Sequence, residues 1–270
     1  MSDWPAAFEA ELLRLGVQPC RARRLAAETA QQAAESAGAP GAVFGPAHLY
    51  ARHLVAELNA PAVTPARTRF EPGPIMLSLA GVAKKYRRQT IFADVNLTVR
   101  GGEVAAIVGA NGCGKSTLLR ICAGLTRPSA GTIKRTRRVG LVPQDGGTAG
   151  WLTAEEHFTL FGAAAGMVPG RARSTGLHLA TRLAWRPARK QRAQQMSGGT
   201  RQKLNLVLGE LHAPDLLLLD EPYQGFDQGS YLDFWQQVFA WRDAGRAIVV
   251  VTHLLHDLQH VDHVLDLGER

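Results

Sequence analysis

A glycine-rich loop between an expected strand and an expected helix constrains the fold more than any other feature of this chain. Four residues match the spacing G-x-x-x-x-G-K-[ST], namely Gly109, Gly114, Lys115 and Ser116. The apolar residues 103–108 predict a buried strand before the loop, and residues 117–120 begin a helix after it. Glycine lets the backbone approach a phosphate, and the helix N-terminus adds partial positive charge. The pattern therefore predicts an α/β fold with a phosphate-binding loop.

The side chains of this loop indicate how a nucleotide would be held. Lys115 is expected to reach the β- and γ-phosphates, and the Ser116 hydroxyl is expected to ligate Mg²⁺. Four other loop residues are expected to contact the nucleotide: Asn111, Gly112, Cys113 and Thr117. The alternative is a glycine-rich turn that binds nothing, which the flanking strand and helix disfavour.

Two adjacent carboxylates follow an apolar run. Residues 216–219 are all leucine and predict a buried strand, and Asp220 and Glu221 come at its carboxyl end. Ligands bind at that end of the strands in open α/β sheets. We expect Asp220 to hold Mg²⁺ through its water shell and Glu221 to polarise the attacking water. Without the phosphate loop, a core strand running into a solvated turn would be the better interpretation.

A second helix N-terminus and a histidine extend the pattern. Ser197, Gly198 and Gly199 precede an expected helix from residue 201, which makes a second anion-binding helix start. One ATP needs one phosphate cradle, so a second cradle suggests a site completed by another chain. His253 ends the apolar strand 247–251, again at a carboxyl edge. A lone histidine is usually structural, but its position and neighbours favour a role in the site.

These motifs, in this order and at these separations, resemble the nucleotide-binding domain of ABC transporters. The resemblance covers residues 75 to about 268. It implies a P-loop NTPase fold with a RecA-like core, an antiparallel β subdomain and a helical subdomain. It also implies that ATP and Mg²⁺ are the cofactors and that the protein is an ATPase.

The same resemblance assigns roles residue by residue. Tyr86 is similar to the aromatic residue that stacks on adenine, and packing in the core or at the surface is the alternative role. Gln144 is similar to the glutamine that senses Mg²⁺ and the membrane subunit. Residues 197–199 match the signature motif that caps the γ-phosphate of the opposite protomer. Asp227 matches the loop that joins the two active sites, and His253 matches the histidine on the γ-phosphate.

Three departures from the family pattern are visible. Met196 replaces a leucine, which is nearly isosteric, and Thr200 replaces a glutamine. Residues 224–226 read Gln-Gly-Phe, where the family commonly has two small residues and leucine, so this departure bears on communication between sites. Glu221 is intact, which predicts a hydrolytically competent copy.

The resemblance also implies partners and a location. We expect dimerisation around two Mg-ATP, with a second copy or a paralogous subunit, and a separate membrane-spanning permease. The stretch LTAEEHF, residues 152–158, is similar to export-type members. The expected place is the cytoplasm, peripheral on the inner face of a bacterial-type membrane. A soluble ABC ATPase acting on nucleic acid or ribosomes is the alternative, and nucleic acid is the less expected partner.

Composition agrees with a packed domain of this kind. The 270 residues are 46% hydrophobic, and the apolar stretches are strand-sized, so no transmembrane helix and no signal peptide are expected. Three cysteines without metal-ligand spacing predict a disulfide-free chain. The net charge of +8 falls on the region after residue 74, with basic clusters at 84–88 and 134–138. Nucleic acid, an anionic membrane surface or simple solvation of strand edges would each explain such clusters.

The first 60 residues are expected to form a separate three-helix interaction domain, followed by a proline-rich linker over 61–74 and the ATPase domain over 75–270. Helical periodicity covers 3–15, 19–37 and 46–59, with prolines near the helix starts. The expected packing groups the leucines at positions 12, 13, 15, 25, 49, 54 and 58. Residues 44–58 resemble the HAAS-type helical module found beside bacterial membrane proteins.

Two further groups of side chains have open interpretations. Trp151, Phe158 and Phe161 lie where the family grips its membrane subunit, and they suit either a docking groove or internal packing. Four histidines at positions 253, 256, 260 and 263 have the spacing of a metal-binding helical face. Because that stretch runs from one strand to another, a chance cluster around one functional histidine is the preferred interpretation.

Overall fold

The computed structural model describes residues 4–35, 40, 46–48, 50–52, 55, 73–87, 89–252 and 261–268. The chain divides into two compact units, Met1–Arg69 and Phe70–Arg270.

The smaller unit packs around one face of its first helix. Helix α1 spans Trp4–Arg14 and helix α2 spans Pro19–Glu35. Trp4, Phe8 and Leu12 recur every four residues, so they share one face of α1 and are all buried. The rings of Trp4 and Phe8 stack with centroids 4.9 Å apart. Ala22 and Ala26 of α2 complete this core together with Ala47, Ala51 and Val55.

The leucine packing expected from the sequence is only partly correct. Leu12 is buried, and Leu15 and Leu25 are half-buried against this core. Leu13 is 41% exposed, because its position on α1 turns it away from the face that carries Phe8 and Leu12. The predictions for Leu49, Leu54 and Leu58, like most of the stretch 44–58, lie outside the described residues.

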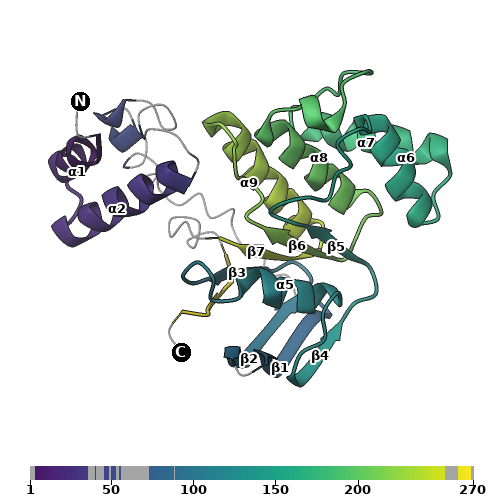
Figure 1. Ribbon diagram of the computed structural model, residues 1–270, viewed down its shortest axis with the longest axis horizontal. Helices are drawn as coiled ribbons and strands as arrows, with labels where there is room; N and C mark the ends of the chain where they lie inside the picture. Colours follow the sequence, from purple (N-terminus) through teal and green to yellow (C-terminus); the bar gives the residue numbers. More distant parts are fainter. Residues whose placement is uncertain are drawn as a thin grey trace. The chain divides into compact units, whose positions relative to one another are not determined.

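The described strands of the larger unit form two sheets (Figure 1). An antiparallel sheet has the order β2-β1-β4, from Gln89–Arg100, Ile75–Tyr86 and Ala130–Arg135. A parallel sheet has the order β5-β6-β7-β3-β8, from Val139–Val142, Leu216–Asp220, Ala247–Val251, Val104–Val108 and His263–Asp266.

The central parallel strands are apolar, except for Asp220 at the end of β6, because both of their faces are covered. Every residue of β3, β6 and β7 is buried. Since side chains alternate along a strand, each strand contributes to two cores. Leu217, Leu219 and Val250 belong to a core shared with the helices, whereas Leu218 and Val249 belong to a core shared with the antiparallel sheet. The sheet therefore separates two hydrophobic layers.

The helices are divided between the two faces of the parallel sheet. Helix α5, Lys115–Ala123, lies on the side of the antiparallel sheet, as Figure 1 shows. On the other side are α6 (Ala154–Ala164), α7 (Pro169–Arg182), α8 (Gly198–Glu210) and α9 (Gln228–Asp243). Helix α6 begins with a capping box, in which Thr153 and Glu156 satisfy each other's backbone N–H groups.

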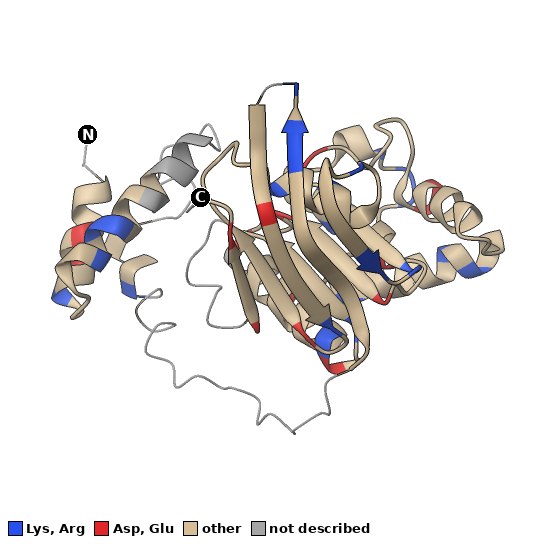
Figure 2. Cartoon of the chain, turned by 90° about the horizontal axis from the view of Figure 1, so that it is seen from below, with Lys and Arg blue, Asp and Glu red and all other residues tan. Residues whose placement is uncertain are grey.

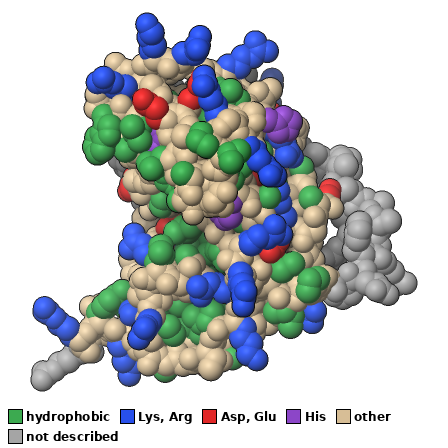
Figure 3. All heavy atoms as spheres, turned by 90° about the vertical axis from the view of Figure 1, so that its right-hand side faces the viewer, with side chains coloured by type: hydrophobic (Ala, Val, Ile, Leu, Met, Phe, Trp, Pro, Cys, Tyr) green, Lys and Arg blue, Asp and Glu red, His purple; other side chains and the backbone are tan. Residues whose placement is uncertain are grey.

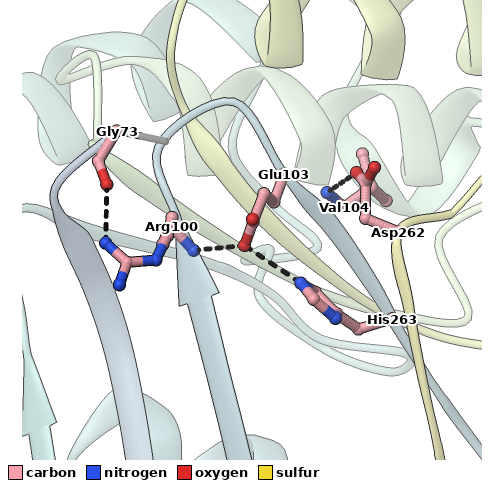
Figure 4. Close-up of polar contacts among 6 residues, drawn as sticks. All are labelled: Gly73, Arg100, Glu103, Val104, Asp262 and His263. Atoms are coloured by element: carbon pink, nitrogen blue, oxygen red, sulfur yellow. Dashed lines mark hydrogen bonds and ion pairs between the residues drawn. The ribbon is translucent and has the colours of Figure 1, made fainter. Parts of the chain in front are cut away.

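The amino-terminal edge of β3 and β8 is held by two carboxylates (Figure 4). Glu103 Oε2 accepts a hydrogen bond from the Arg100 backbone N–H at 2.8 Å and lies 3.0 Å from His263 Nε2. Asp262 Oδ2 accepts from the Val104 N–H at 2.9 Å. These contacts set the register of β8 beside β3, at the edge opposite to the phosphate loop. His263 lies on strand β8, so it does not share a helix with the other three histidines of the spacing noted in the sequence.

Charged residues gather at strand ends rather than within the parallel sheet (Figure 2). Lys84 and Lys85 lie at the end of β1, and Lys134 and Arg135 at the end of β4. Within the part of the chain that the structure describes, no helix combines the length and apolar character needed to cross a membrane.

Candidate functional site

The phosphate loop lies at the carboxyl end of β3 and leads directly into α5. Gly114 is the residue before the helix and has a φ of 105°, a left-handed conformation that favours glycine. A Cβ at Gly114 would lie 2.5 Å from Ile91 Cγ2, so a side chain there would collide with β2. Gly109 has a φ of 140°, with the Cys113 sulfur 2.9 Å from where a Cβ would stand. The glycines are therefore required by the loop's shape and by its close packing.

Lys115 is buried inside this loop. Its side chain is 6% exposed, and Nζ donates hydrogen bonds to the carbonyl oxygens of Gly109 at 2.8 Å and Ala110 at 3.1 Å. The ammonium is thus held at the centre of the loop by backbone oxygens of the same loop. A phosphate bound there would take up this charge.

Asp220 is the last residue of β6 and carries an incompletely satisfied carboxyl group. The side chain is 6% exposed, and Oδ1 has no hydrogen-bond partner among the described residues. Burial raises the pKa of Asp220, and a hydrogen bond from Ser116 opposes this effect. Charge repulsion from Glu221 adds to the rise. A buried oxygen without a partner, beside a hydroxyl, fits the oxygen ligands that Mg²⁺ prefers.

Glu221 follows in a strained backbone conformation. Its φ is 45°, which is uncommon for a residue other than glycine, and its side chain is 9% exposed. The backbone N–H of Glu221 donates to the Val251 carbonyl at 3.2 Å, so β7 holds the residue in this conformation. Gln144 Nε2 donates to Glu221 Oε2 at 2.8 Å. The structure therefore brings together two side chains that the sequence predicted for the site from distant positions.

The predicted signature residues begin α8. Ser197 is the N-cap, and its Oγ accepts a hydrogen bond from the Thr200 N–H at 3.2 Å. A Cβ at Gly199 would lie 2.5 Å from the Gly225 carbonyl oxygen, so the loop after β6 packs directly on this helix start. Gly225 has a φ of 77°, a left-handed conformation that the glycine in the sequence Gln-Gly-Phe can adopt.

Asp227 caps α9 by accepting a hydrogen bond from the Ser230 N–H at 2.8 Å, and this bond lowers the pKa of Asp227.

The remaining predicted site residues include an exposed tyrosine, a thiol within the phosphate loop and a histidine outside the described residues. Tyr86 is at the end of β1, is 51% exposed, and has the Lys84 ammonium 4.7 Å from its ring centroid. Cys113 is a free, half-buried thiol within the loop. His253 lies outside the described residues, as do His256 and His260. No group of three possible metal-ligating side chains occurs within the described ranges.

The three aromatic residues before α8 have different environments. Phe158 is fully buried, and a Cβ at Gly176 of α7 would lie 2.3 Å from its ring, so Phe158 is a packing residue. Trp151 is 70% exposed and Phe161 is 37% exposed. Only the latter two therefore remain available for docking.

Two polar residues that the sequence analysis did not select hold the loop after Gln144. Ala149 N–H donates to His157 Nε2 at 2.9 Å, and Asn205 Nδ2 donates to the Gly146 carbonyl at 3.2 Å. Both side chains are buried. Asn205 could have been noticed in the sequence, because it is the one asparagine within the apolar stretch LNLVLG and asparagine is unusual at a buried position.

Burial of His157 predicts a dependence of stability on pH. Desolvation lowers the pKa of His157 below its usual 6.5, against the opposing bond to the Thr153 carbonyl. Because the fold prefers the neutral ring, this stabilisation is complete above the unfolded pKa and is lost as pH falls through the folded pKa. We expect His157→Gln to lose less thermal stability than the wild type between about pH 7 and about pH 5. Equal slopes of melting temperature against pH would contradict this.

Comparison with known proteins agrees with the arrangement of loop, strands and helices. The family model described as ABC transporter matches residues 92–224. The Nod factor export ATP-binding protein I of Ralstonia nicotianae is 32% identical over 70% of this chain and 64% of its own length. The zinc import ATP-binding protein ZnuC 2 of Aliivibrio fischeri is 34% identical over 72% of this chain and 79% of its own length.

A solved structure shows the same fold. The dimeric, post-hydrolysis ATP-binding cassette MJ0796 bound to ADP and Pi superposes with a TM-score of 0.66. The match covers 72% of this chain and 97% of that chain, at 23% identity. The fold predicted from the sequence, a P-loop core with an antiparallel sheet and a helical region, is confirmed. The chain belongs to the ATP-binding proteins of ABC transporters, and its larger unit is an ABC ATPase domain.

Proposed function

We propose that this chain hydrolyses ATP as one half of a two-chain sandwich and thereby drives a separate membrane-spanning permease. The observation that carries the proposal is the contact between Gln144 and Glu221 at the carboxyl edge of the parallel sheet. The phosphate loop and Asp220 lie at this same edge. Ligands of open α/β sheets bind there.

The residues of the chain divide the chemistry between them. Lys115, released from the carbonyls of Gly109 and Ala110, neutralises charge on the β- and γ-phosphates. Glu221 accepts a hydrogen bond from the attacking water and orients it. Gln144 holds the Glu221 carboxylate in the structure and releases it as the water enters. His253 is assigned to the γ-phosphate on the family pattern.

The residues also fit a magnesium ion. Ser116, Asp220 and Gln144 would hold it, and the unpartnered Asp220 Oδ1 is the observation that supports this assignment. When bound, the ion neutralises charge that develops on the phosphate oxygens.

A second copy, or a paralogous subunit, is proposed to complete each site. Ser197 and Gly198 are exposed at the start of α8, where backbone N–H groups and the helix dipole favour an anion. The phosphate loop already provides one such cradle within the chain, so the signature residues are available to the partner's nucleotide. The dimeric cassette bound to ADP and Pi supports this arrangement.

The permease is proposed to dock beside Trp151. Three apolar side chains on α6 and in the loop before it are exposed, Trp151 at 70%, Leu160 at 54% and Phe161 at 37%. Figure 3 shows hydrophobic and basic side chains interspersed over the face that carries α6 and α7. Exposed tryptophan and arginine are the residues most enriched at protein–protein contacts. Docking there would place the chain at the inner face of the membrane.

Export is the proposed direction. Support comes from the stretch LTAEEHF and from the likeness to a Nod factor export protein, although an import protein is similarly related. Accumulation of substrate inside inside-out membrane vesicles on addition of ATP would be the expected result. The N-terminal helices, proposed to be a HAAS-like interaction domain, would bind a further partner.

The proposal is tested with the full-length tagged chain in detergent-solubilised membranes. We expect an integral membrane protein to copurify at a fixed ratio, and Trp151→Asp to abolish its recovery because a charge would enter the contact. Lys134→Ala, at an exposed position on β4, is the matched control. Tight binding of RNA or DNA with no membrane partner would overturn the proposal.

The contacts of the basic clusters give no support to nucleic acid as the partner. Lys84 Nζ donates to the Arg127 carbonyl at 2.8 Å and covers Tyr86, and Arg138 forms an ion pair with Asp215. These two side chains are paired within the chain.

A further inference from the structure

The loop between β5 and α6 carries Gln144 and belongs to no helix or strand ladder, although a turn closes between Ala149 and Leu152. Gly146 and Gly147 follow each other with φ values of 82° and 78°. Consecutive left-handed glycines permit many backbone conformations, so the position of such a loop depends on contacts from outside it. The backbone N–H groups of Ala193 and Gln194 bond to the carbonyls of Leu152 and Gly150 near its end, and two buried polar side chains hold the part closer to Gln144.

The first anchor is Asn205 on α8. Its side chain is 5% exposed, and Nδ2 donates to the Gly146 carbonyl at 3.2 Å and to Gln202 Oε1 at 3.3 Å. A Cβ on Gly147 would lie 2.8 Å from Asn205 Oδ1, so the loop backbone lies directly against the amide. Asn205 Oδ1 itself has no hydrogen-bond partner among the described residues. A buried amide with one unsatisfied atom costs free energy, which argues for a role other than stability.

The second anchor is His157 on α6. The side chain is fully buried, Nε2 accepts from the Ala149 N–H at 2.9 Å, and Nδ1 lies 2.7 Å from the Thr153 carbonyl. Nε2 must accept from the Ala149 N–H and Nδ1 must donate to the Thr153 carbonyl, so the two contacts select the neutral tautomer with its proton on Nδ1. The ring therefore holds the end of the loop against the start of α6.

Both anchors contact the backbone of the loop that follows Gln144. Gln144 Nε2 donates to Glu221 Oε2 at 2.8 Å, and the anchors hold backbone groups that follow Gln144 in the same loop. Asn205 also lies on the helix that begins at the signature residues, so it connects α8 with the Gln144 loop. We infer that Asn205 and His157 are positioning residues that set the place of Gln144 relative to Glu221. This inference rests on the proposed hydrolytic role of Gln144 and Glu221.

A purely structural role makes a different prediction. If Asn205 only stabilises the fold, its loss lowers the melting temperature and leaves the turnover of the folded fraction unchanged. If it positions Gln144, its loss lowers kcat while nucleotide affinity is kept, because Lys115 and the phosphate loop are not touched. The two roles are separated by kinetics and by coupling to Gln144.

The test uses Asn205→Asp in the full-length chain, since this change keeps the shape and replaces the donor with an oxygen that repels the Gly146 carbonyl. We expect kcat at saturating Mg-ATP to fall about tenfold or more, with affinity for a fluorescent ATP analogue within about twofold of the wild type. Amide hydrogen exchange over residues 145–149 is expected to quicken without nucleotide. Thr159→Val, which removes a hydroxyl bonded to the Glu155 carbonyl on α6, is the matched control and is expected to change neither.

A double-mutant cycle then asks whether Asn205 acts through Gln144. In a Gln144→Ala background, Asn205→Asp is expected to change kcat by less than about twofold, because the side chain that it positions is absent. Full multiplication of the two effects, or unaltered hydrogen exchange and kcat in Asn205→Asp, would overturn the inference. A failure of the proposed function would give a different result. Glu221→Gln would then hydrolyse ATP at the wild-type rate, while hydrogen exchange in the loop would still respond to Asn205→Asp.

Discussion

Glu221→Gln is expected to bind ATP with unchanged affinity and to lose turnover by a factor on the order of 10² to 10³. The amide keeps the shape of the side chain, and its oxygen can still accept the bond from Gln144 that the structure shows at 2.8 Å. It cannot serve as a carboxylate base for the attacking water. Phosphate release at saturating Mg-ATP is the measurement, with analogue binding as the check on affinity.

The same variant is expected to accumulate as an ATP-bound dimer. Hydrolysis is what reopens the proposed sandwich, so a chain that binds ATP without cleaving it stays closed. Size-exclusion chromatography with and without Mg-ATP would show the shift. Asp243→Asn, at the end of α9, is the control for loss of one negative charge. Wild-type hydrolysis by Glu221→Gln would show that the role of Glu221 is wrong.

Lys115→Ala is expected to weaken ATP binding by about 10- to 100-fold, as loss of charge-assisted hydrogen bonds to phosphate implies. The ammonium stands at the centre of the loop, held by the carbonyls of Gly109 and Ala110, and nothing else in the loop carries a positive charge. Binding of a fluorescent ATP analogue would measure the loss.

Lys134→Ala serves as the charge-matched control for this change, because Lys134 is exposed on β4. Melting temperatures of the two variants without nucleotide would separate a folding defect from a binding defect. If Lys115→Ala bound the analogue as tightly as the wild type, the loop would not be the phosphate site.

Much of the fold and of the site could be predicted because local signals agree with the tertiary structure. The strands 216–219 and 247–251 were predicted from continuous apolar runs, which only strands covered on both faces retain. The helices after the two glycine motifs were predicted from residues 117 and 201, and they begin slightly earlier, at Lys115 and Gly198. The prediction that Leu13 packs in the core was wrong, because helical periodicity shows which residues share a face of α1 but not which face is buried.

The loop, the two carboxylates after β6 and the signature residues are recognisable in the amino-acid sequence because each is a pattern of near neighbours in the chain. Which distant groups meet depends on how the strands and helices pack. Gln144 and Glu221 are 77 residues apart and come into contact because β5 and β6 pair in parallel. Burial of Asp220 and the anchors Asn205 and His157 likewise come from packing of α6 and α8 against the sheet, which no local pattern specifies.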